Sequence, residues 1–105
     1  MLTQLRKGVL DYLVLNSLIA APQYGLALAR RLEDSGLIAS EGTLYPILTR
    51  LRERGWVDTH WQESSAGPPR RYYELTKTGR GVFEDFLSTW QTFKELVDTE
   101  VSQSE

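Results

Sequence analysis

Two short stretches of the sequence concentrate side chains that can recognise nucleic acid. Residues 40–45 place two hydroxyls, a carboxylate and a phenol within about two helical turns, namely Ser40, Glu41, Thr43 and Tyr45. Such groups at the start of a helix can hydrogen-bond to base edges in a DNA major groove. Residues 67–71 place the guanidinium groups of Arg70 and Arg71 directly after Gly-Pro-Pro, and guanidinium groups bind phosphate oxygens. Both stretches therefore predict a nucleic-acid interface, with further phosphate contacts expected from Tyr24, Arg50 and Lys77.

Other kinds of chemistry lack the residues that they need. The sequence has one histidine, His60, and no cysteine, so it offers no ligand set for zinc and no disulfide. No nucleophile stands in a recognisable arrangement with a base, and there is no glycine-rich phosphate-binding loop. We therefore expect no enzyme, no metal site and no cofactor. The lack of cysteine also agrees with a cytoplasmic location.

The net charge of −2 is unusual for a protein that binds nucleic acid, but the charge is unevenly distributed. Residues 41–81 contain seven basic and five acidic side chains, which gives +2. Residues 82–105 contain one basic and six acidic side chains, which gives −5. The mildly basic middle of the chain can face phosphates while the acidic end points away.

The first half of the chain predicts three helices. Apolar residues recur at helical spacing over residues 3–20, 24–34 and 40–54. The apolar run in the first of them contains Asp11 and Asn16 and is too short to span a bilayer. We therefore expect this segment to be a buried helix, and we expect no contact with a membrane.

The third helix has two possible starting points. Ser40 as the N-cap would put Pro46 deep inside the helix, where its ring removes a backbone hydrogen bond. Thr43 as the N-cap would put Pro46 in the first turn, where it is tolerated. A loose first turn followed by regular helix from Leu44 is a compromise between them. Gly55 is expected to end the helix.

The second half predicts a β-hairpin. Val57, Thr59 and Trp61 alternate with polar residues, which is typical of a strand. Residues 63–69 are rich in serine, glycine and proline and are expected to form an unpaired loop, and residues 70–75 the return strand. The predicted fold is mainly α with a two-stranded β-wing, which is a winged helix-turn-helix.

A long last helix completes the chain. Thr76 is expected to cap it, and it should reach about Glu100 before a frayed tail over residues 101–105. Its regularly spaced apolar side chains should not remain in water. A chain of this length also buries a modest share of its surface, so we expect a homodimer with an interface formed by Val9, Tyr12, Leu13, Phe83, Leu87, Trp90, Leu96 and Val97.

We accordingly expect two functional regions within one compact domain. Residues 1–76 would form the winged helix-turn-helix that binds DNA. Residues 77–105 would form the C-terminal dimerisation helix with its short tail. The two recognition helices of the dimer would then enter major grooves about one helical turn apart.

Two sequence motifs carry a family resemblance. Residues 40–48, Ser-Glu-Gly-Thr-Leu-Tyr-Pro-Ile-Leu, with Arg50-Leu51 and Gly55-Trp56-Val57, resemble the recognition helix of PadR-type transcriptional regulators. Residues 67–79 resemble the wing of that family and its exit, and Tyr24-Gly25 resembles the start of its second helix. The resemblance covers about residues 5–97. It implies a dimeric repressor that binds inverted-repeat operator DNA and is released by a small molecule, in the short subgroup with one C-terminal dimerisation helix.

A closer likeness concerns Trp90. Lactococcal multidrug regulators of this family have a tryptophan in the last helix that faces its mate across the dimer and sandwiches flat aromatic compounds. The likeness implies an effector pocket around Trp90, with Phe86 and Phe93 as neighbours. These two phenylalanines depart from the lactococcal pattern and are large enough to fill such a cavity. Trp90 is therefore either a ligand platform or part of the interface core.

The residues are also compatible with two functions in which DNA binding has little role. The chain could be an aromatic-ligand-binding dimer, or a winged-helix module for protein interactions. Arg50 could contact phosphate or pair with Glu41 or Glu53, and Tyr45 could contact DNA or lie in the core. The operator, the regulated genes and the identity of an effector are not encoded in any motif, and repression is favoured over activation by the resemblance alone.

Overall fold

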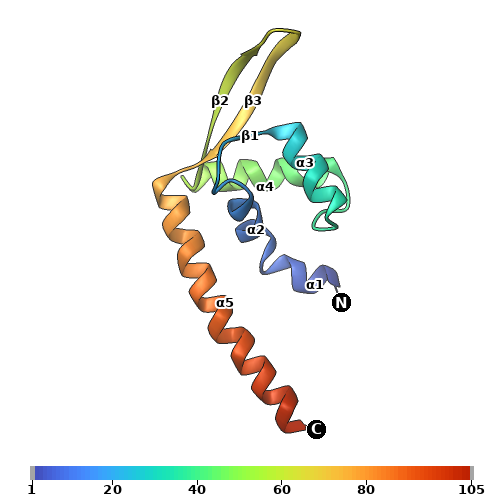
Figure 1. Cartoon of the computed structure of the whole chain (residues 1–105), viewed down its shortest axis with the longest axis vertical. Helices are drawn as coiled ribbons and strands as arrows, with labels where there is room; N and C mark the ends of the chain where they lie inside the picture. The colour runs from blue at the N-terminus through green and yellow to red at the C-terminus, as the bar shows by residue number, and fades with distance from the viewer. Residues whose placement is uncertain (1, 105) are drawn as a thin grey trace.

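The structure is a computed structural model that describes the backbone of residues 2–104 and the side chains of residues 5–103. In chain order the elements are α1 (Leu2–Lys7), α2 (Leu10–Ser17), β1 (Gln23–Tyr24), α3 (Gly25–Asp34), α4 (Glu41–Glu53), β2 (Val57–Ser64), β3 (Gly67–Leu75) and α5 (Lys77–Ser104). The β2–β3 hairpin projects from one side of the helical body and α5 extends away on the other (Figure 1). The predicted fold class is confirmed. Met1 and Glu105, the outer bounds of the two expected regions, lie outside the described residues.

The core lies where α2, α3 and α4 meet the base of the hairpin. Leu44, Leu48 and Leu51 of α4 are buried against Leu28 of α3 and Leu15 of α2. Burying one leucine side chain contributes about 1.5–3 kcal/mol, so this stripe fixes α4 on the helical body. The opposite face of α4 is left in solvent.

The sheet has a third strand that the sequence pattern did not predict. Its order is β1-β3-β2, with both pairs antiparallel. β1 pairs Gln23 with Tyr73 and Tyr24 with Tyr72. A strand of two residues is too short to produce a periodic signal. It nevertheless fixes the start of α3 to the base of the wing.

The prediction of an unpaired loop over residues 63–69 is wrong. β3 begins at Gly67, which pairs with Ser64 of β2. Pro68 and Pro69 have no N–H to donate, but β1 pairs with β3 only farther along, at residues 72 and 73. One edge of β3 is therefore open beside the two prolines. On the other edge neither proline is paired with β2, because the register shifts between Gln62 and Ser64 opposite them. The wing is therefore longer than expected, with an irregular register near its tip and a turn at residues 65–66.

The single helix expected over residues 3–20 is also wrong. The helix is interrupted after Lys7, a second helix begins at Leu10, and that helix ends at Ser17. Val9 N donates to the carbonyl of Arg6 at 3.0 Å, as in a tight turn. Gly8 lowers the helical propensity at this point. The break separates α1 from α2, so the two can follow different directions along the molecule (Figure 1).

The start of α5 agrees with the prediction, and its end does not. The Gly79 N–H donates to Thr76 Oγ1 at 2.9 Å, so Thr76 is the expected cap. The helix continues to Ser104, so the prediction of a frayed tail is wrong for residues 101–104. No glycine or proline follows Gly81 to stop the helix. None of the helices in residues 2–104 combines the length and apolar character needed to cross a membrane.

Candidate nucleic-acid interface and aromatic groove

The exposed end of α4 carries the first group of predicted contact residues. Ser40 is the N-cap, with extended φ and ψ of −156° and 161°, so the first of the two predicted starting points is the one observed. Its Oγ lies 3.3 Å from Thr43 Oγ1, and Thr43 N donates to the Ser40 carbonyl at 3.1 Å. Pro46 lies inside the helix on its exposed side. Both hydroxyls face solvent and retain further hydrogen-bonding capacity.

Glu41 at the start of α4 has a partner on α3. Arg30 Nε lies 3.4 Å from Glu41 Oε1, with both side chains substantially exposed. A pair this exposed contributes little to stability because water screens it. The arginine nevertheless offsets the negative charge of the Glu41 carboxylate. The carboxylate retains the capacity to accept further hydrogen bonds from solvent or a ligand.

Tyr45 lies between the core and solvent. Its side chain is 41 % exposed, while Cε1 would lie 3.6 Å from a methyl group placed on Gly25. Burial raises the pKa of the Tyr45 phenol above its ordinary value of 10.0, and Tyr73 and Glu41 raise it further. The phenol therefore stays protonated and can donate a hydrogen bond.

The two wing arginines point to opposite faces of β3, because successive residues of a strand alternate. The Arg70 guanidinium carbon lies 4.9 Å from the ring centre of Tyr24. The Arg71 guanidinium carbon lies 5.6 Å from the ring centre of Trp61, and its Nε donates to Thr59 Oγ1 at 2.8 Å. Both side chains are thus oriented by neighbours, on two different surfaces of the wing.

Tyr24 and Lys77 lie at different places relative to α4. Tyr24 precedes α3 as its N-cap residue and lies beside Tyr72 of the wing, with ring centres 6.0 Å apart. Lys77 follows Thr76, whose hydroxyl donates to the Gly55 carbonyl at 2.7 Å. Lys77 therefore lies near the C-terminal end of α4, away from the end that carries Ser40.

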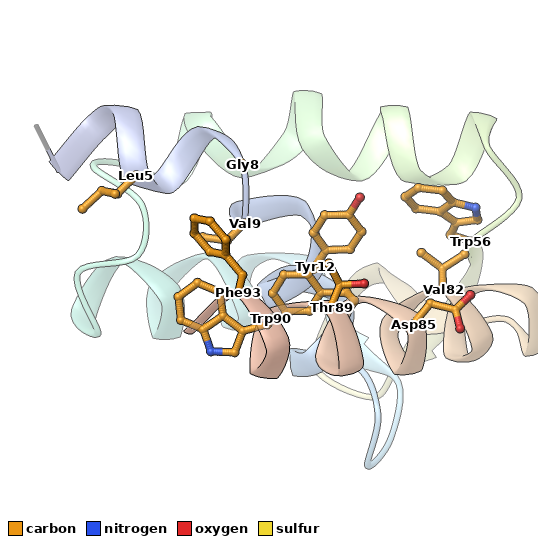
Figure 2. Close-up of a pocket in the computed structure, with 11 residues that line it drawn as sticks. Leu5, Gly8, Val9, Tyr12, Trp56, Val82, Asp85, Thr89, Trp90 and Phe93 are labelled. Carbon is orange, nitrogen blue, oxygen red and sulfur yellow. The ribbon is translucent and has the colours of Figure 1, made fainter. Parts of the chain in front are cut away.

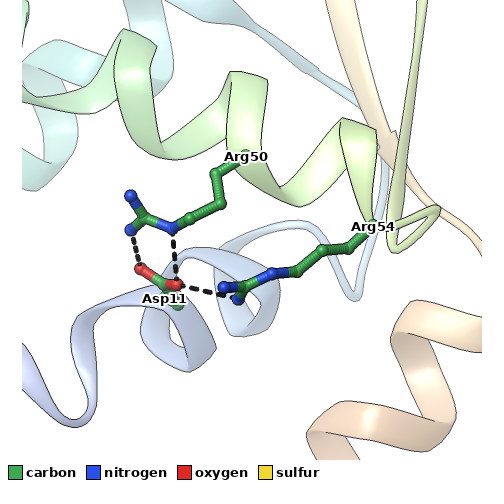
Figure 3. A network of polar contacts seen from close by, with 3 residues as sticks. All are labelled: Asp11, Arg50 and Arg54. Atoms are coloured by element: carbon green, nitrogen blue, oxygen red, sulfur yellow. Dashed lines mark hydrogen bonds and ion pairs between the residues drawn. The ribbon is translucent and has the colours of Figure 1, made fainter.

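Arg50 is paired within the chain, with a partner that the sequence did not suggest (Figure 3). Its Nε donates to Asp11 Oδ2 at 3.1 Å and its Nη2 to Asp11 Oδ1 at 2.5 Å. Arg54 Nη1 lies 3.5 Å from the same carboxylate. The hydrogen bond to Asp11 raises the pKa of Arg50 above its ordinary value. The alternative pairing of Arg50 with Glu41 or Glu53 is not observed among the described residues.

An apolar groove runs between α1–α2 and α5 (Figure 2). It has a volume of about 650 Å³ and includes Trp56 and Val82 towards one end, Trp90 and Phe93 towards the other. The Phe86 ring stacks on Tyr12, with centres 4.5 Å apart and planes 6° apart. Phe86 therefore forms a wall of the groove and leaves it open in the single chain.

The distal part of α5 exposes a large apolar surface. Trp90 is 40 % exposed and Leu96 is 59 % exposed, and Leu87, Phe93, Val97 and Val101 are exposed as well. Val9, Tyr12 and Leu13, which the sequence suggested for the same interface, are partly buried beside it. Phe83 differs, because it is only 8 % exposed and belongs to the core of its own chain.

Two residues on these surfaces were missed by the sequence reasoning. Asp11 was noted only as a polar residue in an apolar run, and its partner Arg50 is 39 positions away. The sequence pattern marks Trp61 only as a strand residue, and it is 65 % exposed on the face that carries Arg71. The alternation of the strand could have assigned Trp61 to a face, whereas no local pattern reveals the partner of Asp11.

Comparison with known proteins identifies the family. The sequence model of the PadR-like transcriptional regulator family matches residues 14–85. A PadR-family transcriptional regulator from Eggerthella lenta is 34 % identical, with a TM-score of 0.84 over 96 % of this chain and 88 % of that one. A PadR-like regulator from Bacillus cereus is 31 % identical, with a TM-score of 0.83 over 93 % of this chain and 96 % of that one. These homologues are transcriptional regulators and not enzymes. The chain therefore belongs to the PadR-like family of transcriptional regulators.

Proposed function

We propose that this protein is a homodimeric repressor that binds an inverted-repeat operator and is released by a flat aromatic effector. The observation that carries the proposal is the amphipathic arrangement of α4. Its leucines are buried, while Ser40, Thr43 and Tyr45 at its N-terminal end remain accessible. That is the arrangement with which a recognition helix reads a major groove.

Sequence readout is assigned to the start of α4 and phosphate binding to the wing. We propose that Ser40, Glu41, Thr43 and Tyr45 contact base edges, because they are polar and lie on the first two turns of α4. Tyr24, Arg70, Arg71 and Lys77 would contact the backbone. Arg70 and Arg71 face opposite ways on β3, which suits contacts with the two walls of a groove. Arg50 is left out of this set because Asp11 already engages its guanidinium group.

Dimerisation is assigned to α5, so that residues 77–105 are the dimerisation helix and residues 1–76 the DNA-binding region. The exposed Leu87, Trp90, Leu96 and Val97 recur at helical spacing, and a second copy of the same helix would bury them. Val9, Tyr12 and Leu13, which lie beside Phe86 and Trp90 of their own chain, would contact the partner's α5. The acidic side chains of the distal half of α5, Glu95, Asp98 and Glu100, then lie on the part of the helix that extends away from the wing (Figure 1).

The effector is assigned to the groove between α2 and α5. Its walls are aromatic, and Trp90 lies both in the groove and on the proposed interface. A ligand stacked there would favour one spacing of the two DNA-binding regions. If that spacing does not match the operator, the ligand lowers the affinity for DNA. The largest possible decrease equals the ratio of the ligand's affinities for the spacing that it favours and for the spacing that fits the operator.

The decisive experiment is DNA binding across a salt series. Fluorescence anisotropy would compare duplexes from the region upstream of the protein's own gene with a scrambled duplex of equal length. We expect tighter binding to one upstream duplex and a linear fall of the logarithm of affinity with the logarithm of salt. If an in vitro selection from random duplexes also fails to yield a preferred sequence, operator binding is refuted.

The groove supports a second candidate function, that of an aromatic-ligand-binding dimer with little role in DNA binding. This second function predicts that flat aromatic compounds quench the fluorescence of Trp90 strongly. It also predicts that DNA affinity is weak and insensitive to sequence. Tight operator binding by the wild-type protein would exclude it even if ligands also bind.

A further inference from the structure

The ion-pair network on the flank of the recognition helix has an unusual charge balance. One carboxylate, that of Asp11 on α2, faces two guanidinium groups on α4 and its C-cap, those of Arg50 and Arg54 (Figure 3). Arg50 engages both carboxylate oxygens with two of its nitrogens, which is the geometry that fixes an arginine in direction as well as in distance. The network therefore retains one net positive charge on the flank of α4.

The network lies between α2 and the flank of α4. The Asp11 side chain is 19 % exposed, whereas those of Arg50 and Arg54 are 44 % and 47 % exposed. The acid is thus set between the helices and the arginines reach it from the flank of α4. Arg50 follows Thr43 by seven residues, or about two turns, so it lies on the same side of α4 as one of the proposed base contacts.

Arg54 ties this network to a further element. Its guanidinium carbon lies 5.1 Å from the ring centre of Trp56, which follows α4 and leads into β2. The carboxylate and the indole thus hold Arg54 from two sides. Without Asp11, both arginines would lose their shared partner on α2. Arg50 would then be a flexible cationic side chain next to the recognition helix, and Arg54 would keep only its contact with Trp56.

We infer that Asp11 is a positioning residue for DNA recognition, which holds Arg50 and Arg54 away from phosphates and fixes the orientation of α4. An arginine that contacts a phosphate raises affinity for every DNA sequence alike, because phosphate contacts carry no sequence information. The leucine stripe fixes α4 on the helical body, and the two hydrogen bonds from Arg50 to Asp11 add a directional constraint on the flank of the same helix. Asp11 thereby lowers non-specific affinity and raises sequence preference. The inference rests on the proposed function.

The test is the variant Asp11→Asn, which keeps the shape of the side chain and removes its charge. Anisotropy would measure affinity for a duplex selected from a random library and for a scrambled duplex, between roughly 50 and 300 mM salt. We expect affinity for scrambled DNA to rise several-fold and its salt slope to steepen by about 1 for each arginine that reaches a phosphate. The ratio of selected to scrambled affinity should fall about fivefold or more, on the order of one lost base contact.

Three comparison variants separate positioning from simple charge removal. Asp34→Asn at the end of α3 changes the net charge equally and should leave the affinity ratio near the wild-type value. Asp11→Asn combined with Arg50→Gln and Arg54→Gln should return the salt slope to the wild-type value or below it. Asp11→Glu keeps the charge and should restore part of the preference.

The outcomes distinguish this inference from the proposed function. A wild-type protein without preference for any duplex would overturn the proposed function, and the role of Asp11 with it. If the wild type does discriminate, an unchanged slope and ratio in Asp11→Asn would overturn the role of Asp11 alone. Equal losses of affinity for both duplexes would also overturn it, because they indicate general destabilisation of the fold.

Discussion

The close approach of α5 to the end of α4 predicts that alanine at Gly79 destabilises the fold and that alanine at Gly81 stabilises it. A methyl group added to Gly79 would lie 2.1 Å from the Trp56 carbonyl oxygen, 2.9 Å from its carbonyl carbon and 2.8 Å from Leu75 Cδ1. A methyl group added to Gly81, two residues farther along the same helix, meets nothing within 4 Å. Neither glycine has a positive φ, so alanine fits the backbone at both positions and the local contacts alone decide the outcome.

The magnitudes follow from these contacts. The obstacle at Gly79 is backbone that is itself engaged, because Thr76 N donates to the Trp56 carbonyl at 3.0 Å. The clash cannot be relieved by a rotamer change, and overpacking of this kind costs about 3 kcal/mol or more. Gly81→Ala should instead stabilise the protein by roughly 0.5–1 kcal/mol, because alanine is the better residue inside a helix.

The assay is urea denaturation followed by circular dichroism, at one fixed protein concentration so that any dimerisation contributes equally. The midpoint should fall for Gly79→Ala and rise for Gly81→Ala, with similar slopes for both variants and the wild type. A loss of less than about 1 kcal/mol at Gly79, well below the overpacking cost, would show that α5 does not approach Trp56 as closely as the structure has it. Since this contact joins α5 to the base of the wing, Gly79→Ala should also weaken operator binding at temperatures where it remains folded.

Three further predictions concern the wing, the interface and Tyr45. Replacing Arg70 or Arg71 singly by alanine should weaken binding to operator and scrambled DNA alike, and should flatten the salt slope by about 0.9 for each lost phosphate contact; an unchanged slope in an anisotropy titration would remove that arginine from the interface. The double variant Phe93→Glu with Leu96→Glu should sediment as a monomer, because it places charges on the apolar surface of α5; a dimer of unchanged affinity would locate the interface elsewhere. The raised pKa of Tyr45 means that the native state holds its proton more tightly than the unfolded state, so stability should fall as pH rises above the ordinary phenol value of 10.0. Tyr45→Phe should reduce that fall in denaturation measured from about pH 9 to 11, and an identical fall in both proteins would contradict a shifted Tyr45.

The elements that could be predicted are those with a strong local cause. The leucines of α4 recur at helical spacing, and Gly36 and Gly55 adopt φ values of 82° and 79° where the helices α3 and α4 end. Thr76 caps α5 through the Gly79 N–H, as its place before a polar first turn suggested. In each case the cause lies within a few residues of the effect, so the sequence alone is sufficient.

The errors arise where distant parts of the chain decide the local structure. Pro68 and Pro69 are typical strand breakers, but they are accommodated because β3 is open towards β1 at that level and its register with β2 shifts opposite them. β1 exists because Gln23 and Tyr24 pair with this same edge of β3 farther along, at Tyr73 and Tyr72, which the residues around them do not reveal. The pairing of Asp11 with Arg50 requires the packing of α2 on α4, which is a property of the assembled core.

The register of β3 connects the core to the proposed DNA contacts. Tyr73 is buried and points towards α3, where its Cε2 would lie 3.0 Å from a methyl group on Gly25. Because side chains alternate along a strand, burying Tyr73 places Arg71 on the same face and Arg70 on the face of Tyr72. A slip of one residue would expose Tyr73 and exchange the faces of the two arginines. The contact of Tyr73 with Gly25 therefore determines which surface of the wing the guanidinium groups of Arg70 and Arg71 occupy. A core mutation that disturbs this contact should alter DNA binding although it changes no residue proposed to face DNA.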